Sequence, residues 1–492
     1  MSAIASASGA SMSYAPPRQF IDGQWREGGG EELIGIVDPA SETEIGSFVA
    51  ASPADINTAL QAAARAFQVW RKAPAWERGK RLRKIAELLL ERRAAIAATL
   101  TAEQGKPFKE SLSEVDTAAA TFEWFAEEGR RAYGRIIPPR ACDVVHEVIK
   151  QPIGVIAAFT PWNFPLLTPA RKIAAALAAG CTCIIKPAEE TPASCAALMQ
   201  ICADAQLPGG VVNMLLGSPE AISTALVAAP SVAKISFTGS AAVGRILMRR
   251  AAEYLKPTTM ELGGHAPVLV FDDADVEAAA FMGVASKFRN AGQLCISPTR
   301  FFVHESVFEK FAELFVAHAA RLRLGPGHLP ETDMGPLANA RRRSSVAAMI
   351  KEARDRGAEC VVTPRGLPAR GYFHAPAVLI DPPASSQCMT VEPFGPIAVL
   401  CRFTDEEEAV RRANELRFGL AAYVHTRSLT RAHRMLREIE AGMVAINHYQ
   451  ASLPEGPFGG VKDSGHGAEC GMEGLDEFLV AKLGNIYLAR SH

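Results

Sequence analysis

One cysteine of this chain lies in a setting suited to covalent chemistry. Cys295 follows Gly292 in the polar segment 288–295, so its thiol comes just after a predicted turn. The segment 261–264, Glu-Leu-Gly-Gly, lies upstream and offers the carboxylate of Glu261. A thiolate is a strong nucleophile, and a carboxylate can serve as a general base beside it. The two residues predict a nucleophile and a base that act on a carbonyl group.

A second candidate is an asparagine between two prolines. Asn163 lies in the segment 160–165, Thr-Pro-Trp-Asn-Phe-Pro. Proline restricts the backbone on both sides, so the side-chain amide is suited to donate a hydrogen bond to an oxyanion that develops on the carbonyl. The alternative is a rigid turn in which Asn163 only caps the helix that follows.

Two further segments carry groups that suit a dinucleotide. One predicted strand, residues 234–237, is followed by Gly239 and Ser240 and then by a helix that carries Gly244, which places backbone amides and a helix N-terminus where a pyrophosphate could bind. Another predicted strand, residues 183–185, is followed by Lys186 and Glu189, where a carboxylate could accept hydrogen bonds from ribose hydroxyls and repel a 2'-phosphate. Each segment also has a simpler interpretation. A strand-to-helix turn needs glycine for its conformation, and Glu189 could belong to a helix cap.

The elements that must position these residues alternate between strand and helix. This βαβαβ alternation, with proline and glycine at the strand ends, is typical of a doubly wound parallel sheet, whose ligands bind at the carboxyl ends of the strands. After Glu261 the alternation starts again, which indicates a second α/β unit. The predicted strands are residues 155–159, 183–185, 211–215, 234–237, 268–271 and 300–303. The predicted helices are residues 75–101, 114–131, 170–179, 194–203, 220–227, 276–288 and 307–321. Short β-like pieces between Gly134 and Val155 are predicted to form a projecting hairpin.

Composition excludes several classes of protein. A chain of 492 residues is long enough for two or three domains. Its 52 basic and 53 acidic residues nearly cancel and form no block of one sign, so we expect a small-molecule partner and neither nucleic acid nor a membrane surface. Ten cysteines without paired spacing fit neither a disulfide framework nor a metal site, which favours a reducing, cytoplasmic location. Residues 1–15 are expected to form a disordered arm and not a signal peptide.

Seven motifs occur in the order that a known family has them. On these motifs the chain resembles the NAD(P)-dependent aldehyde dehydrogenases, and particularly their succinate-semialdehyde dehydrogenase branch. The resemblance implies a Rossmann-like NAD-binding domain (1–130 and 150–263), an α/β catalytic domain (264–463) and a small β bridging element (131–149 and 480–492) that joins subunits of a homodimer or homotetramer. The motifs are residues 161–165, 186–192, 237–240 with Gly244, 261–267, 288–295, 392–396 and 457–465.

The resemblance also implies a reaction. The Cys295 thiolate attacks the aldehyde carbon, and the Asn163 amide and the Cys295 backbone N–H donate to the oxyanion. Hydride passes to the nicotinamide, and Glu261 activates the water that hydrolyses the remaining thioester. Because acylating relatives that transfer to coenzyme A typically lack this glutamate, Glu261 favours a free carboxylic acid as the product. Lys186 is implied as a further catalytic residue.

Cofactor contacts follow from the same motifs. Glu392 and Phe394 correspond to the groups that hold the nicotinamide ribose and ring. Glu189, in place of a small residue, favours NAD over NADP. The implied cofactor-binding residues are Trp162, Lys186, Glu189, Gly239, Ser240, Gly244, Leu262, Glu392 and Phe394.

Two arginines near the candidate nucleophile bear on the substrate. Arg289 precedes Cys295 in its motif, and Arg171 follows the Asn163 motif. Two guanidinium groups near an apolar pocket favour an anion, and arginine is suited to capture a carboxylate. In the succinate-semialdehyde dehydrogenase branch, arginines at these positions and a serine that corresponds to Ser452 bind the distal carboxylate. Ordinary ion pairs on helix surfaces are the alternative.

Several roles stay open at this point. Succinate semialdehyde is the expected substrate, and glutarate semialdehyde, 2-oxoglutarate semialdehyde, lactaldehyde and glycolaldehyde are alternatives. A non-catalytic, crystallin-like member of the fold is an alternative of another class. The chain also departs from the branch, since Ser297 replaces a frequent second cysteine and Ala468 and Cys470 replace an arginine and a glycine. Together with the unusual loop 453–456, these departures leave the length and shape of the substrate open.

Overall fold

The first sheet has eight strands in the order β2-β1-β9-β8-β7-β10-β11-β21. The computed structural model describes residues 14–362 and 366–488. The five strands from β9 to β11 are parallel; β1 and β21, which flank them, are antiparallel to them, and β2 is antiparallel to β1. The central strands are β7 (Val155–Phe159), β8 (Thr182–Lys186), β9 (Val212–Met214), β10 (Val232–Thr238) and β11 (Thr258–Glu261). The edge strands are β1 (Gln19–Ile21), β2 (Gln24–Arg26) and β21 (Gly465–His466).

Helices cover both faces of this sheet, because its central strands are apolar on both sides. Along β7, Val155, Ala157 and Phe159 belong to one core cluster, and Ile156 and Ala158 belong to another. The helices of the first cluster are α1 (Pro53–Trp70), α7 (Pro219–Ala228) and α8 (Ala241–Glu253). Those of the second are α5 (Leu167–Ala179) and α6 (Pro192–Asp204), with α2 (Ala75–Glu91), α3 (Arg93–Gln104) and α4 (Phe108–Glu128) packed outside.

The long helix predicted over residues 75–101 is two helices. The chain leaves the α conformation at Arg92, with φ −99° and ψ 14°, and this residue separates α2 from α3. The apolar period runs through the break because both helices bury their apolar residues in the same cluster. The next predicted helix, over 114–131, is α4, which begins earlier, directly after Pro107, and is followed by a 3-10 turn at Gly129–Arg131.

The second sheet has seven strands in the order β14-β15-β16-β13-β12-β18-β19, and all but β14 are parallel. Its strands are β12 (Ala266–Val270), β13 (Pro298–His304), β14 (Glu359–Val362), β15 (Ala377–Ile380), β16 (Ile397–Phe403), β18 (Ala421–His425) and β19 (Met443–Ile446). Its helices are α9 (Val276–Phe288), α10 (Glu305–Ala319), α11 (Ala340–Asp355), α12 (Gln387–Thr390), α13 (Glu406–Asn414) and α14 (Leu429–Glu438). The chain crosses from the first sheet to the second between β11 and β12, at the segment that starts with Glu261.

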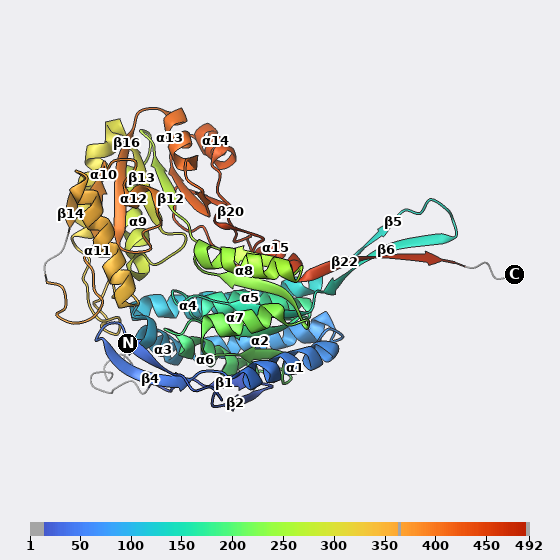
Figure 1. The fold of residues 1–492 in the computed structure, drawn as a ribbon. Helices are drawn as coiled ribbons and strands as arrows, with labels where there is room; N and C mark the ends of the chain where they lie inside the picture. The colour runs from blue at the N-terminus through green and yellow to red at the C-terminus, as the bar shows by residue number, and fades with distance from the viewer. Residues whose placement is uncertain (1–13, 363–365, 489–492) are drawn as a thin grey trace.

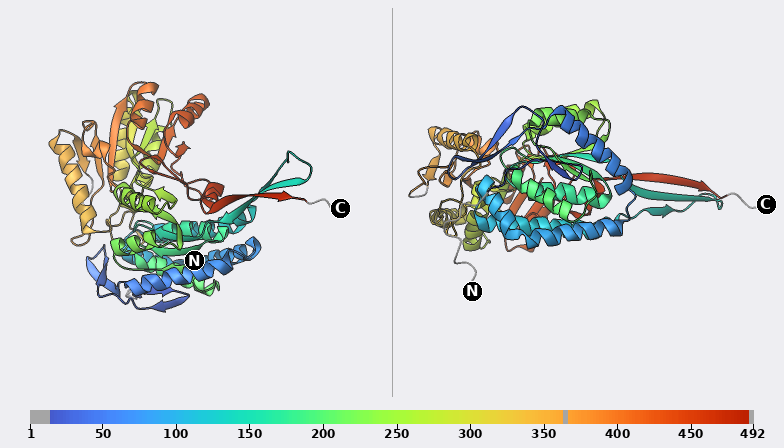
Figure 2. Two further views of the ribbon diagram at one scale, coloured as in Figure 1. Left: turned by 45° about the vertical axis from the view of Figure 1, so that its right-hand side comes forward. Right: turned by 90° about the horizontal axis from the view of Figure 1, so that it is seen from below.

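A third, antiparallel sheet projects from the body of the molecule, as Figures 1 and 2 show. It consists of the hairpin β5 (Arg135–Ile137) and β6 (Val144–Pro152) and the C-terminal strand β22 (Leu479–Tyr487), which follows the short helix α15 (Gly471–Asp476). Two small ribbons complete the fold, β3 (Leu33–Asp38) with β4 (Thr43–Val49) and β17 (Phe418–Gly419) with β20 (Val461–Lys462).

Both chain ends extend beyond the residues that the structure describes. Most of the arm predicted over residues 1–15 lies outside them, but Tyr14 is included and its hydroxyl donates to Glu103 Oε2 at 2.8 Å. Residues 489–492 of the predicted bridging element also lie outside. Within the described residues, no helix has the length and apolar character needed to cross a membrane.

Candidate active site

Cys295 lies just after a sharp turn between α9 and β13. Asn290 and Ala291 have left-handed backbone conformations, with φ of 46° and 52°, and Gly292 follows at 73°. A Cβ atom at Gly292 would lie 2.1 Å from a neighbouring carbonyl oxygen, so only glycine fits this turn. Burial, and then the Glu392 carboxylate, raise the pKa of the Cys295 thiol to about 12. The thiol is therefore protonated near neutral pH and must lose its proton to act as a nucleophile.

Glu261, the last residue of β11, is 1% exposed. The segment that it starts lies against the nucleophile segment, because a Cβ atom at Gly264 would lie 2.5 Å from the carbonyl oxygen of Cys295. Neither carboxyl oxygen of Glu261 has a hydrogen-bond partner among the described residues. Burial, and next the Glu469 carboxylate, raise the pKa of Glu261 well above its ordinary range. A carboxylate whose pKa is raised holds a proton more tightly, which suits a general base.

The structure brings Asn163 to the same place. Its side-chain Nδ2 donates to the carbonyl oxygen of Gln293 at 3.0 Å, just before Cys295. The side chain is buried, and its Oδ1 has no hydrogen-bond partner in the described part of the chain. Because Nδ2 carries a second hydrogen, the amide can still donate to an oxyanion formed beside Cys295.

A buried ion pair beside Glu261 is not indicated by the motifs. Lys172 Nζ lies 2.6 Å from Glu469 Oε1 and donates to Ser236 Oγ at 3.0 Å. Both members of the pair are buried, and Glu469 contributes to the raised pKa of Glu261. The burial of α5 indicates such a pair. Every residue of this helix is buried, so the charge of Lys172 needs a carboxylate inside the protein.

Cys470 occupies the position at which the family that the chain resembles usually has a glycine. Its backbone has φ 62° and ψ 175°, a region nearly restricted to glycine. The chain therefore keeps the glycine-type backbone path next to Glu469 and places a buried thiol there.

Arg171 and Ser452 meet in the structure. Arg171 is 7% exposed, and its Nη2 donates to Ser452 Oγ at 2.7 Å. The guanidinium carbon lies 4.2 Å from the centre of the Phe458 ring, and the ion pair with Glu469 is long, at 4.0 Å. Arg171 Nε has no partner among the described residues, and the Arg171 charge opposes the raised pKa of Cys295. A buried guanidinium with spare donors beside the thiol favours an anionic ligand.

Arg289 lies at the exposed border of the site. Its side chain is exposed, and its guanidinium carbon lies 5.7 Å from the centre of the Phe164 ring. Burial, and then Cys295, raise the pKa of Tyr423, and the Arg289 charge opposes both effects. Tyr423 therefore lies near both Cys295 and Arg289. The two arginines therefore differ, since Arg171 is buried and Arg289 is exposed.

The carboxyl end of β10 leads directly into α8. Ser240 is exposed and caps this helix by accepting the N–H of Val243 at 3.3 Å. The helix packs closely on the segment after β11, because a Cβ atom at Gly244 would lie 2.7 Å from Leu262 Cδ2. Gly239, directly before the cap, is half-buried. This helix N-terminus has the donors and the positive dipole end that hold a phosphate group.

Two further strand ends lie along the same edge of the first sheet. Lys186 Nζ, at the end of β8, lies 2.7 Å from Glu189 Oε1, and burial lowers the pKa of Lys186. Trp162 follows β7, and its ring packs edge-on against Phe394 with 5.4 Å between ring centres. Carboxylate and ring groups beside a phosphate-type helix end suit the ribose and base parts of a dinucleotide.

Glu392 connects this edge to the Glu261 segment. Its Oε1 accepts the N–H of Gly264 at 3.1 Å. Burial raises the pKa of Glu392 to about 7, and the Gly264 N–H, Arg342 and Lys287 act against this rise. Neither Arg342 nor Lys287 is indicated by the motifs. Lys287 is buried and donates to Ser297 Oγ at 3.0 Å, so the serine that replaces a second cysteine has a structural partner.

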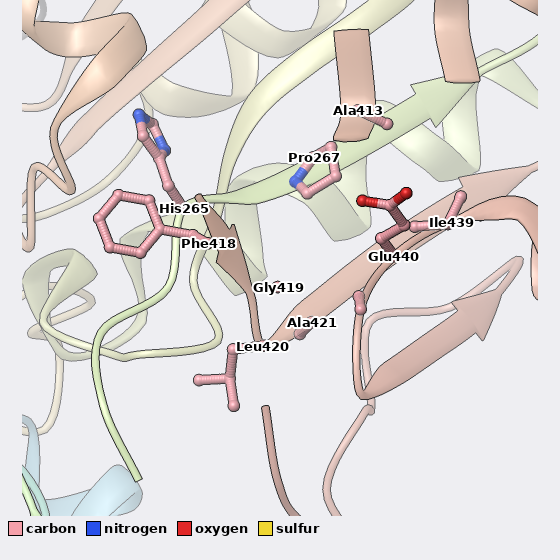
Figure 3. Close-up of a pocket in the computed structure, with 10 residues that line it drawn as sticks. His265, Pro267, Ala413, Phe418, Gly419, Leu420, Ala421, Ile439 and Glu440 are labelled. Atoms are coloured by element: carbon pink, nitrogen blue, oxygen red, sulfur yellow. The ribbon is translucent and has the colours of Figure 1, made fainter. Parts of the chain in front are cut away.

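A small cavity is lined by a different set of residues. Figure 3 shows His265 and Phe418 together on one side of it, with Glu440 and Ile439 on another. Burial lowers the pKa of His265 well below its ordinary range, so the ring is neutral. Because Cys295, Glu261 and Asn163 are not among its lining residues, this cavity is not the candidate active site.

The chain is similar over most of its length to proteins of known family. Residues 25–483 match the model of the aldehyde dehydrogenase family. The 4-(hydroxymethyl)benzenesulfonate dehydrogenase TsaD1 of Comamonas testosteroni is 45% identical over 469 residues, which cover 95% of this chain and 98% of that enzyme. The succinate-semialdehyde dehydrogenase (NADP(+)) GabD of Escherichia coli (strain K12) is 41% identical over 463 residues, 94% of this chain and 96% of the relative.

Solved structures agree with the sequence relatives. The crystal structure of succinate-semialdehyde dehydrogenase from Burkholderia pseudomallei superposes with a TM-score of 0.94 at 41% identity, over 98% of this chain and 100% of that chain. The predicted α/β fold with a Rossmann-like sheet is confirmed. Members of the matched family use NAD or NADP, act on small aldehydes and are generally oligomeric. This chain belongs to the aldehyde dehydrogenase family and is an oxidoreductase that acts on aldehydes.

Proposed function

We propose that this enzyme oxidises an aldehyde that carries a distal anion, with succinate semialdehyde as the first candidate and succinate as its product. The observation that carries the proposal is Arg171. It is buried, it donates to Ser452, it has an Nε without a partner in the described chain, and its charge acts on Cys295. A carboxylate at the far end of the substrate would satisfy these donors while the aldehyde lies at the thiol.

The proposed reaction uses three of the buried groups. The Cys295 thiolate forms a bond to the aldehyde carbon, and the Asn163 amide donates to the oxygen that becomes negative. When bound, NAD supplies the acceptor for the hydride that leaves this carbon. Glu261 then takes a proton from the water that attacks the thioester, which releases the free acid and the thiol. The support for these roles is the shared location of the three side chains and the unpartnered carboxyl oxygens of Glu261.

The raised pKa values predict activity that increases with pH. At pH 7 the Cys295 thiol, with a pKa of about 12, is mainly protonated, so each rise in pH increases the thiolate, and the raised pKa of Glu261 acts in the same direction. We expect kcat/KM to rise by close to tenfold per unit between pH 7 and pH 9. Initial rates from pH 6 to pH 10 at constant ionic strength measure it, and a profile that is flat or falls above pH 7 would contradict it.

The cofactor is proposed to be NAD, with NADP used less well. Glu189 supports this preference, because its carboxylate lies at the strand end that would meet the adenosine ribose and already pairs with Lys186. Glu189→Ser should lower the NAD-to-NADP ratio of kcat/KM by about tenfold or more, since it removes a negative charge from the site of the 2'-phosphate. Initial rates with each cofactor measure the ratio. An unmodified enzyme that prefers NADP would show that Glu189 does not have this role.

A sulfonate is a second candidate for the distal anion. The 45% identical relative is named for a benzenesulfonate substrate, and the loop 453–456 beside Ser452 departs from the branch that binds succinate semialdehyde. A sulfonate presents oxygens to a guanidinium much as a carboxylate does, and an aromatic ring between the groups would need a longer pocket.

A panel of aldehydes in matched pairs tests the proposal. Succinate semialdehyde is compared with butanal, glutarate semialdehyde with pentanal, and 4-sulfobenzaldehyde with benzaldehyde, each at saturating NAD. The proposal requires the anionic member of at least one pair to be oxidised about 100-fold more efficiently. Equal kcat/KM within every pair would remove the anion from the proposal.

We also propose the domain roles that the resemblance implies. Residues 1–130 and 150–263 would bind NAD, residues 264–463 would hold the thiol, and residues 131–149 and 480–492 would join subunits of a homodimer or homotetramer. Exposed apolar side chains on the projecting sheet support the last role, with Leu483 56% and Tyr487 67% exposed. Sedimentation that gives the mass of a monomer at micromolar concentration would overturn it.

A further inference from the structure

A fully buried charge pair fixes the main chain at Asn163. Lys106 lies between α3 and α4, and its Nζ donates to the carbonyl oxygen of Asn163 at 2.7 Å and pairs with Glu114 Oε2 at 2.6 Å. The other oxygen of Glu114 accepts the N–H groups of Leu166 and Leu167, at 2.9 Å and 3.1 Å. Glu114 therefore caps the start of α5, and Lys106 holds the turn that precedes this helix. Neither residue belongs to the proposed reaction.

The same contacts continue to the nucleophile segment. Asn290 Nδ2 donates to the carbonyl oxygen of Asn163 at 3.1 Å, and Gln104 Nε2 donates to Asn290 Oδ1 at 2.9 Å. Gln104 Oε1 in turn accepts the N–H of Lys106 at 3.0 Å. One carbonyl oxygen thus accepts a donor from the helical layer of the first sheet and another from the turn that carries Cys295. The amide of Asn163 completes the ring by its bond to the Gln293 carbonyl.

This network differs from a general stabilising ion pair in where it acts. A buried charge pair contributes little net stability compared with apolar side chains of similar volume, so stability alone does not account for Lys106 and Glu114 inside the core. A buried polar network whose charged groups are paired does fix one geometry, because any displacement leaves a charged group without its partners. Here the fixed point is the backbone of the residue whose amide must reach the oxyanion.

We propose that Lys106, Glu114 and Gln104 are positioning residues for the oxyanion donor: they set the place of the Asn163 amide relative to Cys295. The proposal rests on the proposed role of Asn163 in the reaction. A donor displaced by a fraction of an ångström loses part of the roughly 100- to 1000-fold effect that one oxyanion donor supplies.

A double-mutant cycle separates positioning from folding stability. Lys106→Met combined with Glu114→Gln removes both charges together, and the glutamine keeps an oxygen for the N–H groups of Leu166 and Leu167. We expect this variant to lose about 10- to 100-fold in kcat with succinate semialdehyde, or with the best aldehyde of the panel, while KM for NAD changes less than about twofold. In an Asn163→Ala background the same pair of changes should cost less than about twofold, because its effect passes through the missing amide.

The outcomes are distinct. If the loss is equally large in both backgrounds, or if the variant keeps full kcat, the positioning proposal is overturned. If Asn163→Ala alone costs less than about fivefold, the proposed role of Asn163 fails and the positioning proposal fails with it. If Asn163→Ala is costly but the loss does not shrink in its background, only the positioning proposal fails.

Two more variants guard against a misfolded protein. Gln104→Met keeps the charge pair and removes the two side-chain bonds of Gln104, to Asn290 Oδ1 and from the N–H of Lys106, and it should lose about 3- to 10-fold in kcat, again only when Asn163 is present. Arg93→Met with Asp116→Asn removes a partly exposed ion pair that joins α3 to α4, and it should leave kcat unchanged. A thermal unfolding curve for each variant shows which proteins are folded. A Gln104→Met loss that persists in the Asn163→Ala background would overturn the proposal even if the Lys106 variant cannot be produced.

Discussion

Replacement of Cys295 by alanine is expected to reduce kcat/KM for aldehyde oxidation by about 10,000-fold or more. No bond can then form between the enzyme and the aldehyde carbon, so hydride transfer loses the intermediate from which it starts. Formation of NADH, followed by absorbance at saturating cofactor, measures the loss. Thermal unfolding with and without NAD checks that the variant still folds and binds the cofactor.

A matched control comes from another thiol. Cys142 is exposed in the segment before β6, and Cys142→Ala should leave kcat/KM within about twofold of the unmodified enzyme. If the Cys295 variant keeps more than about 1% of the activity, covalent catalysis by this thiol is wrong. If both variants lose activity, the effect does not belong to Cys295 alone.

Glu261→Gln is expected to separate the two halves of the reaction. Glutamine keeps the shape of the buried side chain but cannot take a proton, so the thioester should form and then hydrolyse slowly. We expect one NADH per active site in a fast burst, followed by a steady-state rate about 100- to 10,000-fold below normal. Stopped-flow absorbance resolves both phases.

Two results would count against this role of Glu261. A steady-state rate within about tenfold of normal would show that another group activates the water. Loss of the burst together with the steady rate would place Glu261 in the first half of the reaction, as the base for the Cys295 thiol. Glu277→Gln, at an exposed ion pair on α9, is the control and should show neither change.

Local sequence pattern predicted the parts of the fold whose physics is local. The strands β7, β8 and β10 are short apolar runs that end at proline or glycine, and they lie within a residue or two of the predicted ranges. The break at Arg92 was not predictable in this way, because α2 and α3 bury their apolar residues in one core cluster and so share one apolar period. Only the backbone angles at Arg92 distinguish two helices from one.

The residues of the candidate site also fall into two groups, those that local sequence predicts and those that it does not. The motifs name Cys295, Glu261 and Asn163 because each carries distinctive neighbours in the sequence. The partners that tune them are distant in the chain, as in Lys172 with Glu469, which lie 297 residues apart. The tertiary structure determines which distant charged residues pair inside the protein, and the spacing of residues in the sequence does not predict these pairs.

The two arginines illustrate the limit of spacing. Arg171 and Arg289 both flank candidate catalytic motifs. From the sequence alone, both indicate an anionic substrate equally well. The structure distinguishes them, because α5 is wholly buried whereas Arg289 follows the end of α9 at the surface. Arg171 is therefore the residue on which recognition of the anion should depend most strongly.

The central proposal is that the buried Arg171 selects an anionic aldehyde. The most direct test compares kcat/KM for succinate semialdehyde and butanal in the unmodified enzyme and in Arg171→Met, which keeps the length of the side chain without its charge. The ratio of the two values should fall by about 100-fold in the variant, because only the anionic substrate loses a partner and butanal controls for damage to the site. A ratio that stays the same in both proteins would contradict the proposal.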